Sequence, residues 1–279
     1  MAFVSTFDRP QTALDREARI ASRLAVSPFL AEPLRRLGYD SRELWAWANY
    51  RPVVVGFADM LRQAGRVAES RVRVLEIGGG RDPLFTPEEA AAAGIALTVN
   101  DIDAHELSLG PQGHDKALFD IAGEAPHEFG QRFDLVISKM VLEHVKDARR
   151  AWANMGAILA PGGVAMAFHP TLFATPYLIN VVLPESVTAP LLARFFKDRN
   201  ADECPKFPAR YDLCRGDQAR IEPHLKRAGF REALVAPFWG HRYYRHLPGL
   251  RDLVALSERF AEARDWRLLT TYAYTVARR

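Results

Sequence analysis

The segment Val72–Asp101, VRVLEIGGGRDPLFTPEEAAAAGIALTVND, decides the fold of this chain. Its first part is a short apolar run that carries Glu76 and opens directly into the three glycines Gly78–Gly80. A second apolar run follows and ends in an acid, Asp101. Glycines let a backbone approach a ligand closely, and a carboxylate at the end of the next strand can bind two ribose hydroxyls. The pattern therefore predicts a nucleotide-type pocket at the carboxyl edge of a parallel sheet.

The spacing of the glycines indicates which class of nucleotide the predicted pocket binds. A dinucleotide fingerprint needs G-x-G-x-x-G, so that pyrophosphate meets backbone N–H groups at a helix start. Gly78 and Gly80 match the first two glycines, but Pro83 occupies the third position, which disfavours a nicotinamide-dependent oxidoreductase. The sequence has no Walker-type G-K-[ST] motif either. Glu76 instead precedes the glycines in the pattern E-x-G-x-G.

This pattern is the first of five motifs that resemble the class I S-adenosylmethionine-dependent methyltransferases. LTVNDID at Leu97–Asp103 is similar to the second strand of that family, with Asp101 at the ribose-binding position. Asp120 falls near the end of the third strand, where the family often places a side chain beside the adenine amine. Arg132–Asp147 is similar to the fourth strand and its loop, and Leu159–Pro170 to the turn and fifth strand. The motifs are in order, and each interval has room for one strand–helix repeat.

The resemblance covers residues 70–170 and implies both a fold and a cofactor. The fold class is α/β, a doubly wound, mostly parallel seven-stranded Rossmann-like sheet. The cofactor is S-adenosyl-L-methionine, with no metal. The positions that match its binding residues are Glu76, Gly78, Gly79, Gly80, Asp101, Ile102, Asp120 and Ser138. A helix cap is the alternative role for Asp101, although Asp103 suits it better, and a strand-end turn is the alternative for Asp120.

The sequence departs from the family after the second glycine. Asp82 replaces the third glycine, and Thr86–Glu89 supplies an N-cap, a first-turn proline and a capping-box glutamate. Gly94 then stops the helix. An eight-residue loop, Gly78–Phe85, should therefore separate strand from helix. Arg81 in this loop is a hypothesis for the positive charge that meets the methionyl carboxylate, and a solvated arginine is the equal alternative.

The remaining segments predict helices and strands around this core. Residues 1–70 are expected to form a helical N-terminal extension or cap, in which Pro52 opens a separate helix. Residues 71–279 form the methyltransferase domain, with an insertion on the substrate side at residues 170–216. The tail predicts two helices and two strands, namely Ile221–Ala228, Leu234–Phe238, Gly249–Ala263 and an antiparallel final strand at Leu269–Ala277.

Few side chains are candidates for the chemistry. A hydroxyl acceptor needs a positioned base to take its proton. The candidates are His169 at the end of the fifth strand and His144 and Glu143 after the fourth, with packing as the alternative for His144. Two aromatic residues are candidates for substrate contact, Tyr177 and Tyr211. The other histidines are expected to be surface or structural residues: His105, His114, His127, His224, His241 and His246.

Composition limits the setting. The chain has 279 residues, 48% apolar and 25% charged, with a formal net charge of +3. That charge gives no nucleic-acid footprint. Residues 151–184 lack charged side chains, but prolines and glycines divide them into pieces too short for a transmembrane helix. Two cysteines and no visible secretory signal favour a cytoplasmic protein, although one disulfide bridge stays open.

These observations predict a methyltransferase that acts on a small molecule or a sugar hydroxyl. Residues after the fifth strand resemble polysaccharide-associated methyltransferases, which favours surface glycan biosynthesis. One alternative is a non-catalytic S-adenosylmethionine-binding protein, and a nicotinamide-dependent oxidoreductase is a weaker one. Peripheral membrane contact through Leu172–Leu183 is a further alternative. The sequence does not decide the acceptor or the oligomeric state.

Overall fold

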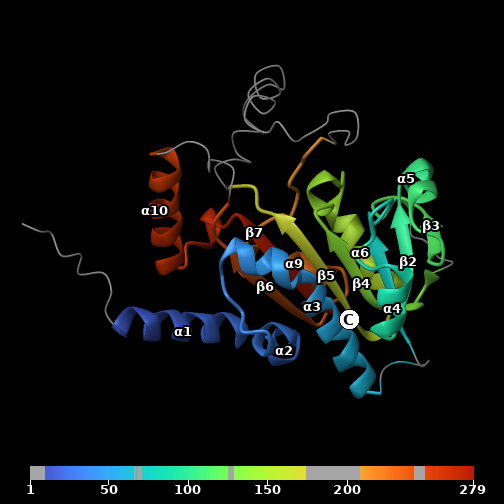
Figure 1. The fold of residues 1–279 in the computed structure, drawn as a ribbon, viewed down its shortest axis with the longest axis horizontal. Coiled ribbons are helices and arrows are strands. Elements are labelled where there is room, and N and C mark those ends of the chain that lie inside the picture. The colour runs from blue at the N-terminus through green and yellow to red at the C-terminus, as the bar shows by residue number, and fades with distance from the viewer. Residues whose placement is uncertain (1–9, 66, 68–70, 125–128, 174–207, 242–248) are drawn as a thin grey trace, which may run out of the picture.

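Seven strands form one sheet in the order β3-β2-β1-β4-β5-β7-β6 (Figure 1). The computed structural model describes residues 10–65, 67, 71–124, 129–173, 208–241 and 249–279. Strands β1 to β5 are parallel, and β7 runs antiparallel to both β5 and β6. The predicted mostly parallel sheet with a reversed final strand is thus confirmed. The strands are β1 (Val72–Ile77), β2 (Ile95–Asp101), β3 (Asp115–Leu118), β4 (Phe133–Lys139), β5 (Leu159–Pro170), β6 (Glu232–Phe238) and β7 (Tyr272–Arg278).

Helices flank this sheet and mostly begin where the sequence places caps. Thr86, Asp103 and Asp147 each accept a backbone hydrogen bond in the first turn of the helix that follows. The α-helices are α1 (Pro10–Leu24), α2 (Pro28–Arg36), α3 (Glu43–Gln63), α4 (Pro87–Ala92), α5 (Ala104–Leu109), α6 (Ala148–Ile158), α9 (Gln218–Arg227) and α10 (Leu250–Ala263). Two short 3₁₀ helices are η2 (Leu142–His144) and η3 (Arg267–Leu269).

The core lies on both sides of the central strands. Leu135 and Val136 point to opposite faces of β4, and neither is exposed. Such strands are apolar throughout because helices cover both faces of a parallel sheet. The polar residue at the start of β4, Asp134, is buried and accepts hydrogen bonds from the backbone N–H and the guanidinium of Arg73. This carboxylate therefore fixes the register of β1 against β4.

Helix α3 corrects one sequence expectation. Pro52 does not open a separate helix but lies inside the continuous helix Glu43–Gln63. A proline removes one intrahelical hydrogen bond, and packing outweighs that loss here. Val53 and Phe57 are fully buried, and the hydroxyl of Tyr50 donates to the backbone oxygen of Ser138 at 2.9 Å. Helix α3 is therefore packed directly on the sheet beside the end of β4.

The tail follows the predicted order with shifted boundaries. Leu159–Pro170, predicted as a turn followed by a strand, lies entirely in β5. The pairing of β4 with β5 shifts register between Phe133 and Leu135. The final strand begins at Tyr272, because η3 occupies the preceding residues. Tyr177, and all of Leu172–Leu183 beyond Phe173, fall outside the described residues. Within the described ranges, no helix combines the length and hydropathy that a membrane span requires.

Candidate active site

The glycine-rich loop after β1 lies against the ends of two other strands. Gly78 and Gly80 have φ values of +70° and +44°, a region that glycine adopts without strain. A Cβ on Gly78 would lie 2.5 Å from the Val141 side chain, in the loop after β4. A Cβ on Gly80 would lie 2.8 Å from Oδ2 of Asp101, at the end of β2. Close contact at this edge thus explains why glycine stands at both positions.

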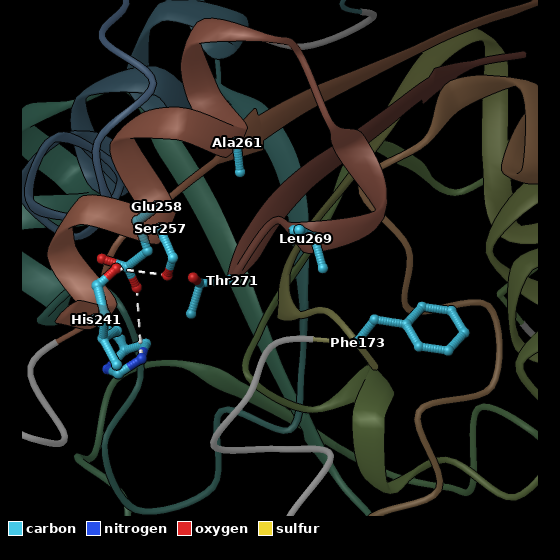
Figure 2. Close-up of a pocket in the computed structure, with 8 residues that line it drawn as sticks. Phe173, His241, Ser257, Glu258, Ala261, Leu269 and Thr271 are labelled. Carbon is cyan, nitrogen blue, oxygen red and sulfur yellow. Dashed lines mark hydrogen bonds and ion pairs between the residues drawn. The ribbon is translucent and has the colours of Figure 1, made fainter. Parts of the chain in front are cut away.

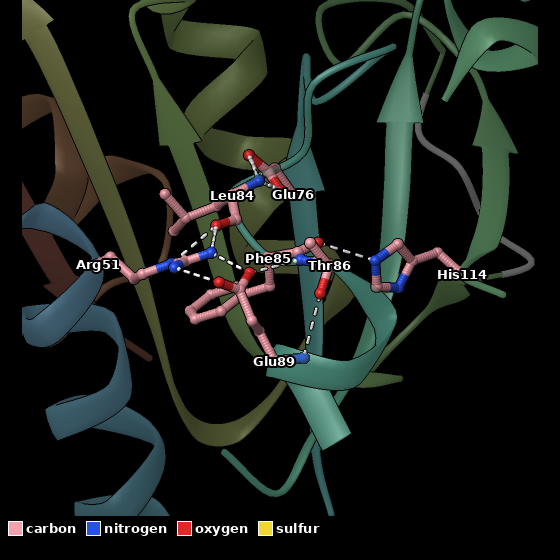
Figure 3. A network of polar contacts seen from close by, with 7 residues as sticks. All are labelled: Arg51, Glu76, Leu84, Phe85, Thr86, Glu89 and His114. Atoms are coloured by element: carbon pink, nitrogen blue, oxygen red, sulfur yellow. Dashed lines mark hydrogen bonds and ion pairs between the residues drawn. The ribbon is translucent and has the colours of Figure 1, made fainter. Parts of the chain in front are cut away.

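A network of polar contacts fixes the far end of the same loop (Figure 3). Both carboxylate oxygens of Glu76 accept from the Leu84 N–H, at 3.1 and 2.9 Å. The Arg51 guanidinium donates to the Leu84 carbonyl oxygen at 2.9 Å, and His114 contacts the Phe85 carbonyl oxygen at 2.9 Å. Burial raises the pKa of Glu76 to about 7, although the Leu84 N–H lowers it. Glu76 therefore holds the loop after β1 in place through the Leu84 backbone.

The helix after this loop does not contribute a free N-terminus. Thr86 and Glu89 form the complete predicted capping box, in which each side chain accepts from the backbone N–H of the other. Helix α4 begins at Pro87, so the predicted eight-residue loop Gly78–Phe85 is confirmed. The loop itself, and not a helix dipole, faces the edge of the sheet.

The end of β2 presents an acid and an apolar side chain. Oδ1 of Asp101 accepts from the Asp103 N–H at 3.0 Å, while Oδ2 lies beside Gly80. Burial raises the pKa of Asp101. Ile102 is 62% exposed. The arrangement suits a ribose with an adenine ring alongside it, because the carboxylate and an open apolar surface are adjacent.

Asp120 and Asn100 form hydrogen bonds at the ends of β3 and β2. Oδ1 of Asp120 accepts a hydrogen bond from the Ala122 N–H at 2.8 Å. Asp120 thus forms a turn after the strand, which was the alternative to its predicted contact with adenine. Asn100 was not singled out from the sequence. Its amide donates to the carbonyl oxygens of Ala117 and Phe119 and so ties β2 to β3. A polar residue within the apolar run of β2 was the signal that could have identified it.

Arg81 forms an ion pair with an acid on α5, Glu106. Its guanidinium donates twice to Glu106, at 2.6 and 2.5 Å. The pairing lowers the pKa of Glu106. The positive charge of Arg81 is thus compensated within the chain, and Glu106 is a partner that sequence reasoning missed.

The end of β4 carries a buried hydroxyl without a partner. Ser138 is fully buried, and among the described residues its Oγ makes no hydrogen bond. Two residues later the backbone of Met140 is left-handed, with φ of +58°, which is uncommon for a residue with a side chain. Lys139 lies over the ring of Trp47, with 5.5 Å between Nζ and the ring centroid. Strained backbone and an unsatisfied hydroxyl at one strand end are typical of a ligand site.

The loop after β4 places Glu143 and His144 together on η2. Glu143 is 3% exposed, its Oε2 accepts no hydrogen bond from any residue that the structure describes, and burial raises its pKa to about 8. Nε2 of His144 lies 3.9 Å from Oε1 of Glu143, and the imidazole is 34% exposed. Nδ1 of His144 contacts the carbonyl oxygen of Pro208 at 3.3 Å. An acid shielded from water therefore stands next to a base that solvent can reach.

Two other predicted residues are placed inside the protein. His169 is 1% exposed, and its ring nitrogens contact the Pro170 carbonyl oxygen at 3.0 Å and Oγ1 of Thr275 at 2.9 Å. Burial lowers the pKa of His169 to about 4. His169, a candidate base in the sequence, is therefore buried at the end of β5 with both ring nitrogens in contact with the protein. Tyr211 is also buried, and its backbone N–H donates to the Glu143 carbonyl oxygen at 3.1 Å.

A small pocket lies farther along the same edge of the sheet (Figure 2). Its volume is about 50 Å³, and its lining residues are Phe173, His241, Val254, Ser257, Glu258, Ala261, Leu269 and Thr271. Nε2 of His241 lies 3.4 Å from Oε1 of Glu258, and the imidazole is 3% exposed. Burial lowers the pKa of His241 to about 4 and raises that of Glu258 to about 7. A surface or structural role was predicted for His241, and Glu258 was not identified as its partner.

Within the described part of the chain, no group of three or more His, Cys, Asp or Glu side chains is placed to hold a metal ion.

The strand order, the reversed β7 and the glycine loop opposite Asp101 define a class of protein, the class I S-adenosylmethionine-dependent methyltransferases. Residues 33–200 match the family model described as a methyltransferase domain. The match spans more than half of the chain, and the chain belongs to that family. Its cofactor is S-adenosylmethionine, as the resemblance implied.

Solved methyltransferase structures are similar to this chain at low identity. A methyltransferase from Archaeoglobus fulgidus is 15% identical with a TM-score of 0.47, over 82% of this chain and 94% of that one. One from Mesorhizobium loti is 17% identical with a TM-score of 0.47, over 80% and 98%. Phosphoethanolamine N-methyltransferase 2 of Haemonchus contortus is 15% identical with a TM-score of 0.47, over 90% of this chain and 60% of that one. A search of curated proteins gave no match.

Proposed function

We propose that this chain transfers a methyl group from S-adenosylmethionine to a hydroxyl of a small molecule or sugar. The glycine loop, Asp101 and Ile102 hold the nucleoside, and Asp120 lies at the adenine end. The unpartnered hydroxyl of Ser138, which no described residue satisfies, supports a ligand at the end of β4. Arg81 is assigned no contact with the methionyl carboxylate, because Glu106 already compensates its charge.

The N-terminal helices are proposed to cover this site. Tyr50 reaches the backbone of Ser138, and Trp47 stands beside Lys139 at the same strand end. These contacts support the role of residues 1–70 as a cap on the domain formed by residues 71–279. Tyr211 supports the acceptor side by fixing the backbone of Glu143. Tyr177 is kept as a substrate residue on its sequence position alone.

For this reaction the chain must align the acceptor with the methyl group and remove one proton from the acceptor hydroxyl. When bound, S-adenosylmethionine supplies a methyl group on a positively charged sulfur. Holding two reactants in line supplies about 7–11 kcal/mol of barrier reduction. A hydroxyl acceptor must also lose its proton, and a positioned base contributes about 10²–10⁴-fold to the rate.

The observation that carries the proposal is the pairing of Glu143 with His144 at the end of β4. A carbonyl oxygen only accepts hydrogen bonds, so the contact with Pro208 places the proton of neutral His144 on Nδ1. Nε2 is then unprotonated, half-exposed and 3.9 Å from Glu143. We propose that Nε2 of His144 removes the proton from the acceptor hydroxyl. The imidazolium formed there lies 3.9 Å from Oε1 of Glu143, and above the pKa of about 8 this carboxylate is ionised and stabilises the imidazolium.

The biological setting is proposed from the sequence after β5. Residues that follow β5 resemble polysaccharide-associated methyltransferases, and most of them lie outside the described residues. Surface glycan biosynthesis in the cytoplasm is therefore the proposed context. Sugar hydroxyls are the first acceptors to test.

The test is turnover of a panel of sugars and small alcohols with wild type and His144→Gln. We expect kcat to fall by about 10²–10⁴-fold and the rise of the rate with pH to disappear, because the base is lost. Affinity for S-adenosylmethionine should be unchanged. His224→Gln, a partly exposed histidine on α9, is the matched control and should keep wild-type turnover. A His144→Gln variant with the wild-type rate and pH profile would refute the assignment.

A further inference from the structure

Helix α10 packs against the protein with its polar side. Oε1 of Glu262 accepts from the hydroxyl of Ser41 at 2.5 Å, and Glu258 faces His241 (Figure 2). Ala261, between these two acids, is 1% exposed. The inward face of the helix therefore carries two acids together with Val254, which lines the pocket beside His241, and Ala261. A surface helix of a globular protein normally turns an apolar face inward.

The outward face of α10 is apolar instead. Leu253 and Leu256 are each 65% exposed, and Phe260 is 46% exposed. Residues three and four apart in a helix share one side, and this side is opposite Glu258 and Ala261. Trp266 extends the surface, because its ring centroid lies 5.3 Å from that of Phe260.

We name this area the α10 surface: Leu253, Leu256, Phe260, Trp266 and Leu268. Leu268 of η3 is 47% exposed and continues the surface beyond Trp266. Contiguous apolar surface of this kind marks an interaction site more often than scattered exposed leucines do.

Positive charge borders the α10 surface. Arg259 and Arg264 are exposed, and neither forms an ion pair with another described residue. The guanidinium carbon of Arg264 lies 4.3 Å from the Phe260 ring centroid and 5.9 Å from that of Trp266. The acids Glu258 and Glu262 face inward, and the exposed Asp252 is paired with Arg251. The border thus presents cations whose charge the helix does not compensate.

We propose that the α10 surface binds a membrane surface that carries anionic phospholipids. An interfacial helix places leucine and aromatic side chains at the acyl boundary and arginine among the headgroups. Tryptophan is favoured at such interfaces because one end of its ring system is polar. The two uncompensated arginines complement anionic headgroups, and this charge complementarity selects a lipid surface over a second copy of the chain. The proposal differs from membrane contact through Leu172–Leu183, since α10 lies elsewhere in the chain.

The test is co-sedimentation of the full chain with vesicles of phosphatidylcholine, alone or mixed equally with phosphatidylglycerol. We expect binding to the mixed vesicles, weakened by salt, and little binding to phosphatidylcholine alone. Leu253→Gln/Leu256→Gln should weaken binding roughly tenfold or more, because apolar burial is lost. Arg259→Gln/Arg264→Gln should weaken it about fivefold for each arginine and flatten the salt dependence. Leu109→Gln is the matched control, a half-exposed leucine on α5 that should bind as wild type does.

Three outcomes would overturn the proposal. One is failure of the wild type to bind mixed vesicles, and another is equal binding by the Leu253→Gln/Leu256→Gln variant. The third is a wild-type dimer, seen by light scattering, that dissociates in this variant, which would assign the surface to a second copy. Thermal melts of each variant show that it is folded. Vesicle binding needs no turnover, so its failure would leave the proposed methyl transfer unaffected.

Discussion

Replacement of Glu143 by glutamine should change how stability depends on pH. The carboxyl group is buried, and burial raises its pKa from an ordinary value of 4.5 to about 8. The unfolded chain therefore releases this proton near pH 4.5, while the folded protein keeps it until about pH 8. Below pH 4.5 the Glu143 carboxyl group is protonated in both states, and its full contribution to the unfolding free energy is present. This contribution is lost as the pH rises through 8, because between these values the folded state binds more protons than the unfolded state.

The size of the effect follows from the two pKa values. Each pH unit between them contributes about 1.4 kcal/mol. The interval from 4.5 to about 8 thus amounts to roughly 5 kcal/mol, as an upper value for the wild type. Glutamine has nearly the same shape and does not titrate, so Glu143→Gln lacks this loss.

The assay is urea unfolding of both proteins from pH 5 to pH 9. The difference in unfolding free energy should grow in favour of Glu143→Gln by several kcal/mol across this range. Glu76 and Glu258 also have raised pKa values, but both proteins contain them and the difference cancels their effect. Glu88→Gln, an exposed acid on α4, is the control and should show no such growth. Parallel stability curves for wild type and Glu143→Gln would refute the reasoning.

Three further predictions concern the glycine loop. Gly80→Ala should lower stability by about 1 kcal/mol or more and weaken S-adenosylmethionine binding, because its Cβ would meet Asp101 at a positive φ; wild-type affinity by calorimetry would contradict this. Arg51→Ala should cost about 1–3 kcal/mol in chemical unfolding, because it leaves the Leu84 carbonyl oxygen without its donor; an unchanged midpoint would show that the loop does not need it. Arg81→Ala should keep S-adenosylmethionine affinity within about threefold of wild type, since Glu106 already compensates the charge of Arg81. A tenfold loss of affinity would indicate that Arg81 contacts the cofactor.

The fold was predictable because local signals and the sheet pattern agree. The capping box at Thr86 and the caps at Asp103 and Asp147 mark helix starts in the sequence, and the structure has helices there. Pro52 misled the prediction, since a proline usually ends a helix. Burial of Val53 and Phe57 against the sheet, which is a tertiary effect, keeps α3 continuous.

The candidate site was predictable in its positions and less so in its contacts. Asp101 and the glycines follow from a motif, and the structure brings them together. The direction of His169 depends on which face of β5 it occupies, and both faces are buried. Long-range pairs such as Arg81 with Glu106 and His241 with Glu258 leave no pattern in a single sequence. The sequence likewise does not indicate which side of α10 packs against the protein, so its apolar outward face could not be predicted.

The central claim is that the glycine loop and Asp101 form a working S-adenosylmethionine pocket. Calorimetric titration of wild type and Asp101→Ala with S-adenosylmethionine, its demethylated product and NAD⁺ tests it directly. We predict micromolar binding of the first two by the wild type, its loss in Asp101→Ala, and no binding of NAD⁺. Binding of NAD⁺ in their place, or equal S-adenosylmethionine binding by wild type and Asp101→Ala, would contradict the account.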